Sequence, residues 1–151
     1  MVPIGCNKCI ECKRQKANNW RVRLSEEIRH DKGIFVTFTF NTEQYRRLMK
    51  KVREDNKEVK GYDLDNAIAL KGIRYFLENW RKKTGKSVKH WLITEIGGKN
   101  YENVHIHGIL FTENRELIGK CWLYGYTYGV KEQTYVNERT INYVVKYLMI
   151  S

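Results

Sequence analysis

The sequence is poor in the features of disordered, secreted and membrane proteins. It contains one proline and shows no low-complexity tract and no internal repeat, which argues against a disordered linker. No run of 18 apolar residues is present, so we expect no membrane span. The N-terminus lacks the apolar stretch of a signal peptide. The length of 151 residues is enough for one domain with a hydrophobic core, so we expect a single domain over residues 1–151.

Acidic residues are scarce relative to basic ones. The chain has 28 Lys and Arg against 17 Asp and Glu, a formal net charge of +11, which predicts a polyanionic partner. Ten Tyr and four Trp accompany this charge, and many adjoin basic residues, as in WRKK at 80–83. Aromatic faces stack on unpaired bases while cations follow the phosphates. The composition therefore favours single-stranded nucleic acid, although several aromatic residues must belong to the core.

Cysteines are few, and three of the four lie close together. Cys6, Cys9 and Cys12 have the spacing C-x2-C-x2-C within residues 1–13, a segment that reads as an irregular N-terminal arm. Without secretion features we expect no disulfides. The three thiols could hold a structural Zn2+ with Cys121 or a histidine as fourth ligand. There are two alternatives: the three cysteines could be part of an iron–sulfur cluster motif, or they could be reduced thiols in a turn.

Hydrophobic periodicity predicts an α+β domain with a central antiparallel or mixed β-sheet flanked by helices. Residues 88–96 and 104–111 read as the two strands of a hairpin. The remaining elements expected are helices at about 15–29, 43–54 (capped by Asn41 or Thr42) and 64–83, a strand at 34–40, one or two short strands within 122–130, and a last helix from near Asn137.

Two histidines flank one isoleucine in the apolar run VHIHGILF at 104–111. Side chains alternate along a strand, so His105 and His107 project from the same side, about 6–7 Å apart along the strand. Two imidazoles at this spacing can share one metal ion. The alternative is a pair of ordinary strand histidines.

A two-histidine site needs a further ligand. If the hairpin is centred on Asn100, Glu95 pairs with His105 and points to the same face. Glu95 would then complete a set of two histidines and one carboxylate, with Glu102 in the loop as the fallback. Such mixed ligands suit Mn2+ or Mg2+. The alternative for Glu95 is an exposed carboxylate at the end of a strand.

The segment TINYVVKYLM at 140–149 predicts an amphipathic helix. Its apolar residues follow the i, i+3, i+4, i+7 pattern of one buried face. Tyr143, Lys146 and Tyr147 fall together on the other side, as neighbours at i, i+3 and i+4. The alternative is that these tyrosines are half-buried with solvated hydroxyl groups, as is common for tyrosine. This alternative explains one tyrosine, but it explains the grouping of two tyrosines and a lysine less well.

The sequence has an H-U-H motif at 105–107, in which U is a hydrophobic residue, and a Y-x-x-K motif at 143–146. This pair of motifs, in this order, is similar to the pair found in the HUH endonucleases, in particular rolling-circle replication initiators. The segments YVVKY at 143–147, GCNKCIEC at 5–12 and FVTFTF at 35–40 resemble the gokushovirus-type initiators of small single-stranded DNA phages. The resemblance runs from about Val2 to the end of the chain. It implies a sheet related to ferredoxin-like folds, and it supports Glu95 as the acidic ligand that precedes H-U-H.

The resemblance implies a site-specific single-stranded DNA endonuclease and strand transferase that initiates rolling-circle replication. Tyr143 would form a covalent 5′-phosphotyrosine intermediate, and Lys146 would supply positive charge beside it. Tyr147 would alternate with Tyr143 as nucleophile; the other reading is that it only packs. The segment at 35–40 resembles a motif associated with DNA binding, through which Thr37 and Thr39 could touch the substrate. Its residues favour the structural alternative, a buried strand.

The expected partner is single-stranded DNA at a replication origin, in the cytoplasm of a bacterial host. The chain lacks a GxxxxGK(S/T) motif, so strand unwinding would need a host helicase, and synthesis a host polymerase. Two alternatives stay open. One is an HUH transposase or relaxase. The other is a non-catalytic nucleic-acid-binding module, in which His105, His107 and Tyr143 are incidental; formation of a covalent adduct separates it from the enzyme.

Overall fold

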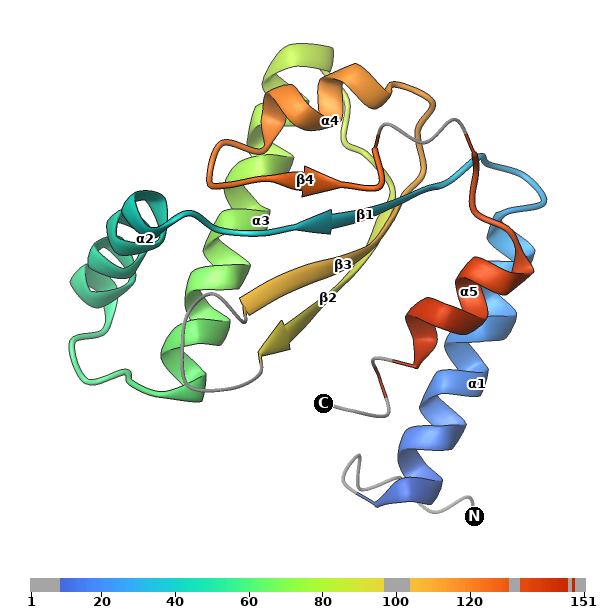
Figure 1. Ribbon diagram of the computed structural model, residues 1–151, viewed down its shortest axis with the longest axis horizontal. Helices are drawn as coiled ribbons and strands as arrows, with labels where there is room; N and C mark the ends of the chain where they lie inside the picture. The colour runs from blue at the N-terminus through green and yellow to red at the C-terminus, as the bar shows by residue number, and fades with distance from the viewer. Residues whose placement is uncertain (1–8, 97–103, 131–133, 147, 149–151) are drawn as a thin grey trace.

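The computed structural model describes residues 9–96, 104–130, 134–146 and 148, and this part of the chain forms five helices and four strands (Figure 1). In chain order they are α1 (Ile10–Glu27), β1 (Ile34–Phe38), α2 (Thr42–Asp55), α3 (Tyr62–Thr84), β2 (His90–Ile96), β3 (Val104–Leu110), α4 (Arg115–Cys121), β4 (Thr127–Tyr128) and α5 (Glu138–Val145).

The four strands form one sheet in the order β2-β3-β1-β4, and every neighbouring pair is antiparallel. The predicted α+β class is confirmed, and of the two sheet types expected the described strands form the antiparallel one. β3 lies between β2 and β1, so both of its backbone edges are paired. β2 lies at one end of this sheet and pairs with β3 alone among the described strands.

Two hydrophobic clusters lie on opposite faces of the sheet, because side chains alternate along each strand. Even-numbered residues of β1 and β3, such as Val36 and Ile106, pack with α2, α3 and α4. Odd-numbered residues, such as Trp91 on β2 and Ile109 on β3, pack with α1 and α5. Figure 1 shows α1 and α5 side by side on this second face. His105 and His107 are odd-numbered and belong to the face that α1 and α5 cover.

Asparagine begins three of the helices. Asn41, Asn114 and Asn137 each accept a hydrogen bond from the backbone N–H three residues later, at 2.8 to 3.2 Å. An N-cap oxygen satisfies an amide that has no partner within the helix. At the other end of α3, Gly85 adopts φ of 77°, the left-handed conformation that ends many helices.

Three expectations about the elements are corrected. The predicted irregular arm does not extend to residue 13, because Cys9 caps α1 and the helix begins at Ile10. Helix α4 was not expected at all, and the strand content expected within 122–130 reduces to the two residues of β4.

No helix in the described ranges is long and apolar enough to cross a membrane.

Gly108 allows β2 and β3 to approach closely. A Cβ atom there would lie 2.0 Å from the Trp91 carbonyl oxygen and 2.8 Å from the Leu92 Cα. We expect Gly108→Ala to lower the free energy of unfolding by about 1–3 kcal/mol or more, the cost of overpacking, in urea denaturation. The matched control is Gly119→Ala in α4, where a Cβ meets no atom within 4 Å. That helical substitution should raise stability by up to about 1 kcal/mol. Equal effects of the two variants would contradict the packing argument.

Candidate metal centre

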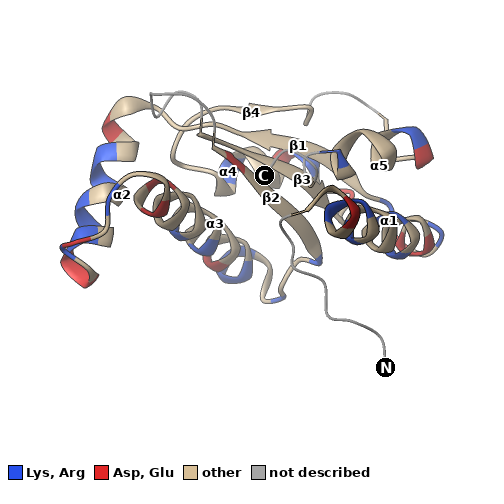
Figure 2. Ribbon diagram, turned by 90° about the horizontal axis from the view of Figure 1, so that it is seen from below, with Lys and Arg blue, Asp and Glu red and all other residues tan. Residues whose placement is uncertain are grey.

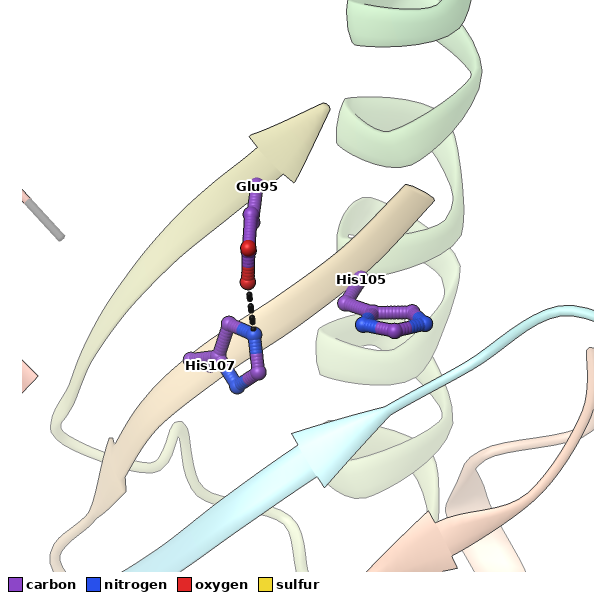
Figure 3. Close-up of side chains that lie close together, drawn as sticks. All are labelled: Glu95, His105 and His107. Carbon is purple, nitrogen blue, oxygen red and sulfur yellow. Dashed lines mark hydrogen bonds and ion pairs between the residues drawn. The ribbon is translucent and has the colours of Figure 1, made fainter. Parts of the chain in front are cut away.

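The register of β2 and β3 brings Glu95 directly opposite His105, as the hairpin symmetry predicted. His107 follows two residues later on the same face of β3. One ligand atom from each of Glu95, His105 and His107 lies within 4.8 Å of the other two (Figure 3). Among the described residues, this is the one group of three metal-ligating side chains that comes together.

Glu95 and His107 already interact. The Nε2 atom of His107 lies 2.6 Å from Oε2 of Glu95, the contact drawn as a dashed line in Figure 3. The His105 and His107 rings are 5.8 Å apart between centroids and nearly perpendicular, at 85°. His107 is buried, whereas the Glu95 side chain is 36% exposed, so the group is open on its carboxylate side.

Thr37 of β1 holds the other nitrogen of the His107 ring. Its Oγ1 lies 3.0 Å from Nδ1, and Thr37 faces His107 across the β1–β3 ladder. A hydroxyl can donate to this nitrogen or accept from it, so the contact fits either tautomer of the imidazole. From the sequence, Thr37 is a possible substrate contact within a buried strand, and its contact with His107 is not predicted. This contact could have been predicted if the strand with alternating threonines at 37 and 39 had been paired with the strand that carries the H-U-H motif.

The neutral form of the His107 imidazole is favoured over the protonated form. Burial lowers the pKa of His107 below its usual value and outweighs the Glu95 carboxylate, which acts in the opposite direction. The proximity of His105 lowers the pKa of His107 further. A neutral imidazole is the form that binds a metal ion, so His107 can act as a ligand at neutral pH without first losing a proton.

The three side chains fit a divalent ion. Ligand atoms about 2.1 Å from a shared ion lie at most about 4.2 Å from one another. The ligand atoms of Glu95, His105 and His107 all lie within 4.8 Å of one another, which is close to this limit. Two imidazoles and one carboxylate also leave coordination positions for oxygen atoms of water or a phosphate. Glu95, His105 and His107 could therefore hold a divalent metal ion.

The two candidate catalytic residues within the described part lie on the exposed side of α5 and at its end. Tyr143 is 52% exposed, and its ring lies 6.2 Å from that of Phe35 in an edge-to-face contact. Phe35 precedes Thr37 by two residues of β1, so both project from the face that carries the metal-ligating residues. Lys146 is exposed and caps the end of α5. Tyr147 lies outside the described residues, as does the fallback ligand Glu102.

The cysteines do not form one four-ligand set. Cys9 caps α1, its Sγ accepting from the backbone N–H of Cys12 at 3.4 Å. Cys121 is fully buried with α3 and α4, on the other face of the sheet from α1, where burial raises the pKa of its thiol. Figure 1 shows α4 far from the N-terminal end of α1. Cys121 therefore cannot share a zinc ion with Cys9 and Cys12, which corrects that part of the expectation. Cys6 lies outside the described residues.

No protein-family model, curated protein or solved structure matches this chain.

Thr37 should position His107 as a ligand, so we expect Thr37→Val to weaken binding of Mn2+ or Zn2+ by about 10-fold or more, the usual effect of removing a residue that orients a ligand. Thr37→Ser keeps the hydroxyl and should bind close to wild type. The matched control is Thr39→Val, because the Thr39 hydroxyl donates to the Tyr126 carbonyl and not to the site. Isothermal titration calorimetry gives the affinities; equal values for Thr37→Val and wild type would contradict this role.

Proposed function

We propose that this protein is a metal-dependent endonuclease and strand transferase for single-stranded DNA that initiates rolling-circle replication. The observation that carries the proposal is the group Glu95, His105 and His107 on the sheet face over which α5 presents Tyr143. The order of the motifs in the sequence, H-U-H followed by Y-x-x-K, also resembles that of rolling-circle replication initiators. The net charge of +11 fits a DNA substrate.

The chemistry proposed is a phosphoryl transfer to tyrosine. A divalent ion at Glu95, His105 and His107 would polarise the scissile phosphate and offset negative charge on the leaving oxygen. The Tyr143 Oη attacks phosphorus, forming a bond to the 5′-phosphate, while the bond between phosphorus and the 3′-oxygen breaks. The phenol loses its proton to solvent, and the 3′-oxygen gains one. Attack by a 3′-hydroxyl reverses the step and rejoins DNA, because the phosphotyrosine ester conserves the bond energy.

Lys146 supports this step through its charge. It follows Tyr143 by three residues, so the two side chains are neighbours on one side of α5. A free phenol ionises near pH 10, so a cation close to the phenolate or to the phosphate favours attack at neutral pH. Tyr147 would serve as the second nucleophile, cutting the regenerated origin while the first tyrosine remains attached. Host helicase and polymerase would supply unwinding and synthesis.

The metal-ligating histidines should control nicking. Removal of the ion costs several kcal/mol of transition-state stabilisation, so we expect His105→Ala/His107→Ala to lower the rate of nicking at least about 100-fold. The control is His30→Ala, since His30 is exposed on the C-terminal side of α1 and contacts Glu26. Single-stranded oligonucleotides with and without Mn2+ provide the assay, and circular dichroism checks the fold. Full activity of the double variant would refute the assignment.

The tyrosines should differ in role. Tyr143→Phe removes the nucleophile of the first step and should lose most covalent adduct, whereas Tyr147→Phe should keep nicking and impair repeated strand transfer. Tyr126→Phe, an exposed tyrosine near β4, is the control and should behave as wild type. The measurement is a denaturing gel of protein incubated with an oligonucleotide library and Mn2+, followed by peptide mapping. DNA attached only outside residues 143–147 would contradict the mechanism, and binding without any adduct would favour a non-catalytic module.

A further inference from the structure

A groove runs along the outer edge of the sheet, beside the candidate metal centre. It has a volume of about 510 Å3 and lies between α1 and the N-terminal end of α3, with β2 as its floor. Figure 2 shows α1 and α3 on either side of β2. We call it the edge groove, and it is lined by Lys16, Trp20, Tyr62, residues 90–94 and Leu148.

The floor of the edge groove presents backbone hydrogen-bonding groups. The Phe111 N–H donates to the Lys89 carbonyl at 2.9 Å, which makes residues 89 and 111 a hydrogen-bonded pair of the β2–β3 ladder. Hydrogen-bonded and non-hydrogen-bonded pairs alternate in an antiparallel ladder. The amides and carbonyls of His90, Leu92 and Thr94 therefore point away from β3, into the groove. Such a row of donors and acceptors is a ready site for a partner with complementary polar edges.

Aromatic rings and a cation form the walls. Tyr62, the first residue of α3, lines the groove and is 59% exposed. On the opposite wall Trp20 packs on Trp91 with ring centroids 5.7 Å apart, and Arg23 lies 4.5 Å from the Trp20 centroid. Lys16 is exposed one helical turn before Trp20. Exposed aromatic faces with adjacent cations are the elements by which proteins hold unpaired nucleotides.

The edge groove also leads to the candidate metal centre. Ile93 belongs to the groove, and Glu95 follows it by two residues on the same face of β2, about 6.6 Å further along the strand. A strand of DNA whose phosphate lies at Glu95 and the two histidines would reach the groove with its next nucleotides.

We propose that the edge groove binds an unpaired nucleotide of the DNA strand that flanks the cleaved phosphate, with its base against Tyr62 and its phosphate near Lys16. This inference rests on the proposed function, since it assumes that the strand is held at Glu95, His105 and His107. A base supplies the planar face that suits the walls and the polar edge that suits the floor. An extended peptide could also pair with the floor, but the basic character of the chain and the exposed ring favour nucleic acid.

The test is DNA binding without cleavage, so that it does not depend on catalysis. Fluorescence anisotropy of the wild-type protein, residues 1–151, with labelled single-stranded oligonucleotides is measured in EDTA. We expect Tyr62→Ala to weaken binding about tenfold or more, the scale of one lost stacking contact, and Tyr62→Phe to bind as wild type. Lys16→Gln should reduce the salt dependence of binding. Tyr126→Ala is the matched control, because Tyr126 is also exposed, at 68%, and lies near β4 at the other end of the sheet.

A second measurement locates the DNA directly. Oligonucleotides carrying 5-iododeoxyuridine are irradiated in complex with the wild-type protein in EDTA, and the cross-linked peptides are mapped. Cross-links to Tyr62, Trp20 or Trp91 support the proposal. Cross-links confined to other residues, together with unchanged affinity of Tyr62→Ala, overturn it and leave the groove to a peptide partner. Covalent adduct formation with Mn2+ is measured separately. An adduct without binding in the groove indicates a nuclease that does not use the groove. Binding in the groove without an adduct indicates a DNA-binding protein that does not cleave.

Discussion

The pairing of β3 on both of its edges is the constraint on which both cores and the candidate metal centre depend. β3 contributes Val104, Ile106 and Leu110 to one cluster and Ile109 to the other, and it carries both histidines. Because the side-chain period of a strand is two, a slip of one residue would exchange the two sets. Ile106 would then face α1 and α5, and His105 and His107 would enter the cluster under α3. The apolar packing on both faces therefore specifies the orientation of the metal-ligating side chains.

The same register sets the electrostatics of the candidate centre. Glu95 reaches the site from the edge strand and stays partly exposed, whereas His107 projects from the central strand and is buried. Burial lowers the pKa of His107 and keeps a lone pair available, and Thr37 on the neighbouring strand orients the ring. An exposed pair of histidines at the same spacing would be more readily protonated and less constrained in its rotamers. The strand order β2-β3-β1 thus supplies a carboxylate, two imidazoles and an orienting hydroxyl from three adjacent strands.

Much of this arrangement follows from local patterns. The hairpin symmetry predicted that Glu95 faces His105, and the i, i+3, i+4, i+7 stripe predicted the buried side of α5, where Ile141 and Val144 are fully buried. Other features depend on tertiary contacts. α4 has seven residues with Gly119 inside, and a helix that short forms only by packing on α3. A cysteine is not a usual N-cap, so the sequence predicts a later start for α1 than the observed Ile10. The burial of Cys121, the last residue of α4, depends on a helix that the sequence does not predict.

The candidate nucleophile and the candidate ligands are held by different means. The ligands lie on paired strands, where each backbone position is secured by the ladder. Tyr143 lies on α5, whose eight residues are too few to be helical alone and are held through their apolar side against α1 and the sheet. One polar contact from α1 adds to this, the Ser25 hydroxyl donating to Glu138 at 3.1 Å. A loss of packing between α1 and α5 would therefore displace the tyrosine while leaving Glu95, His105 and His107 together. In the chemistry proposed here, such a division would allow α5 to shift while Glu95, His105 and His107 stay together.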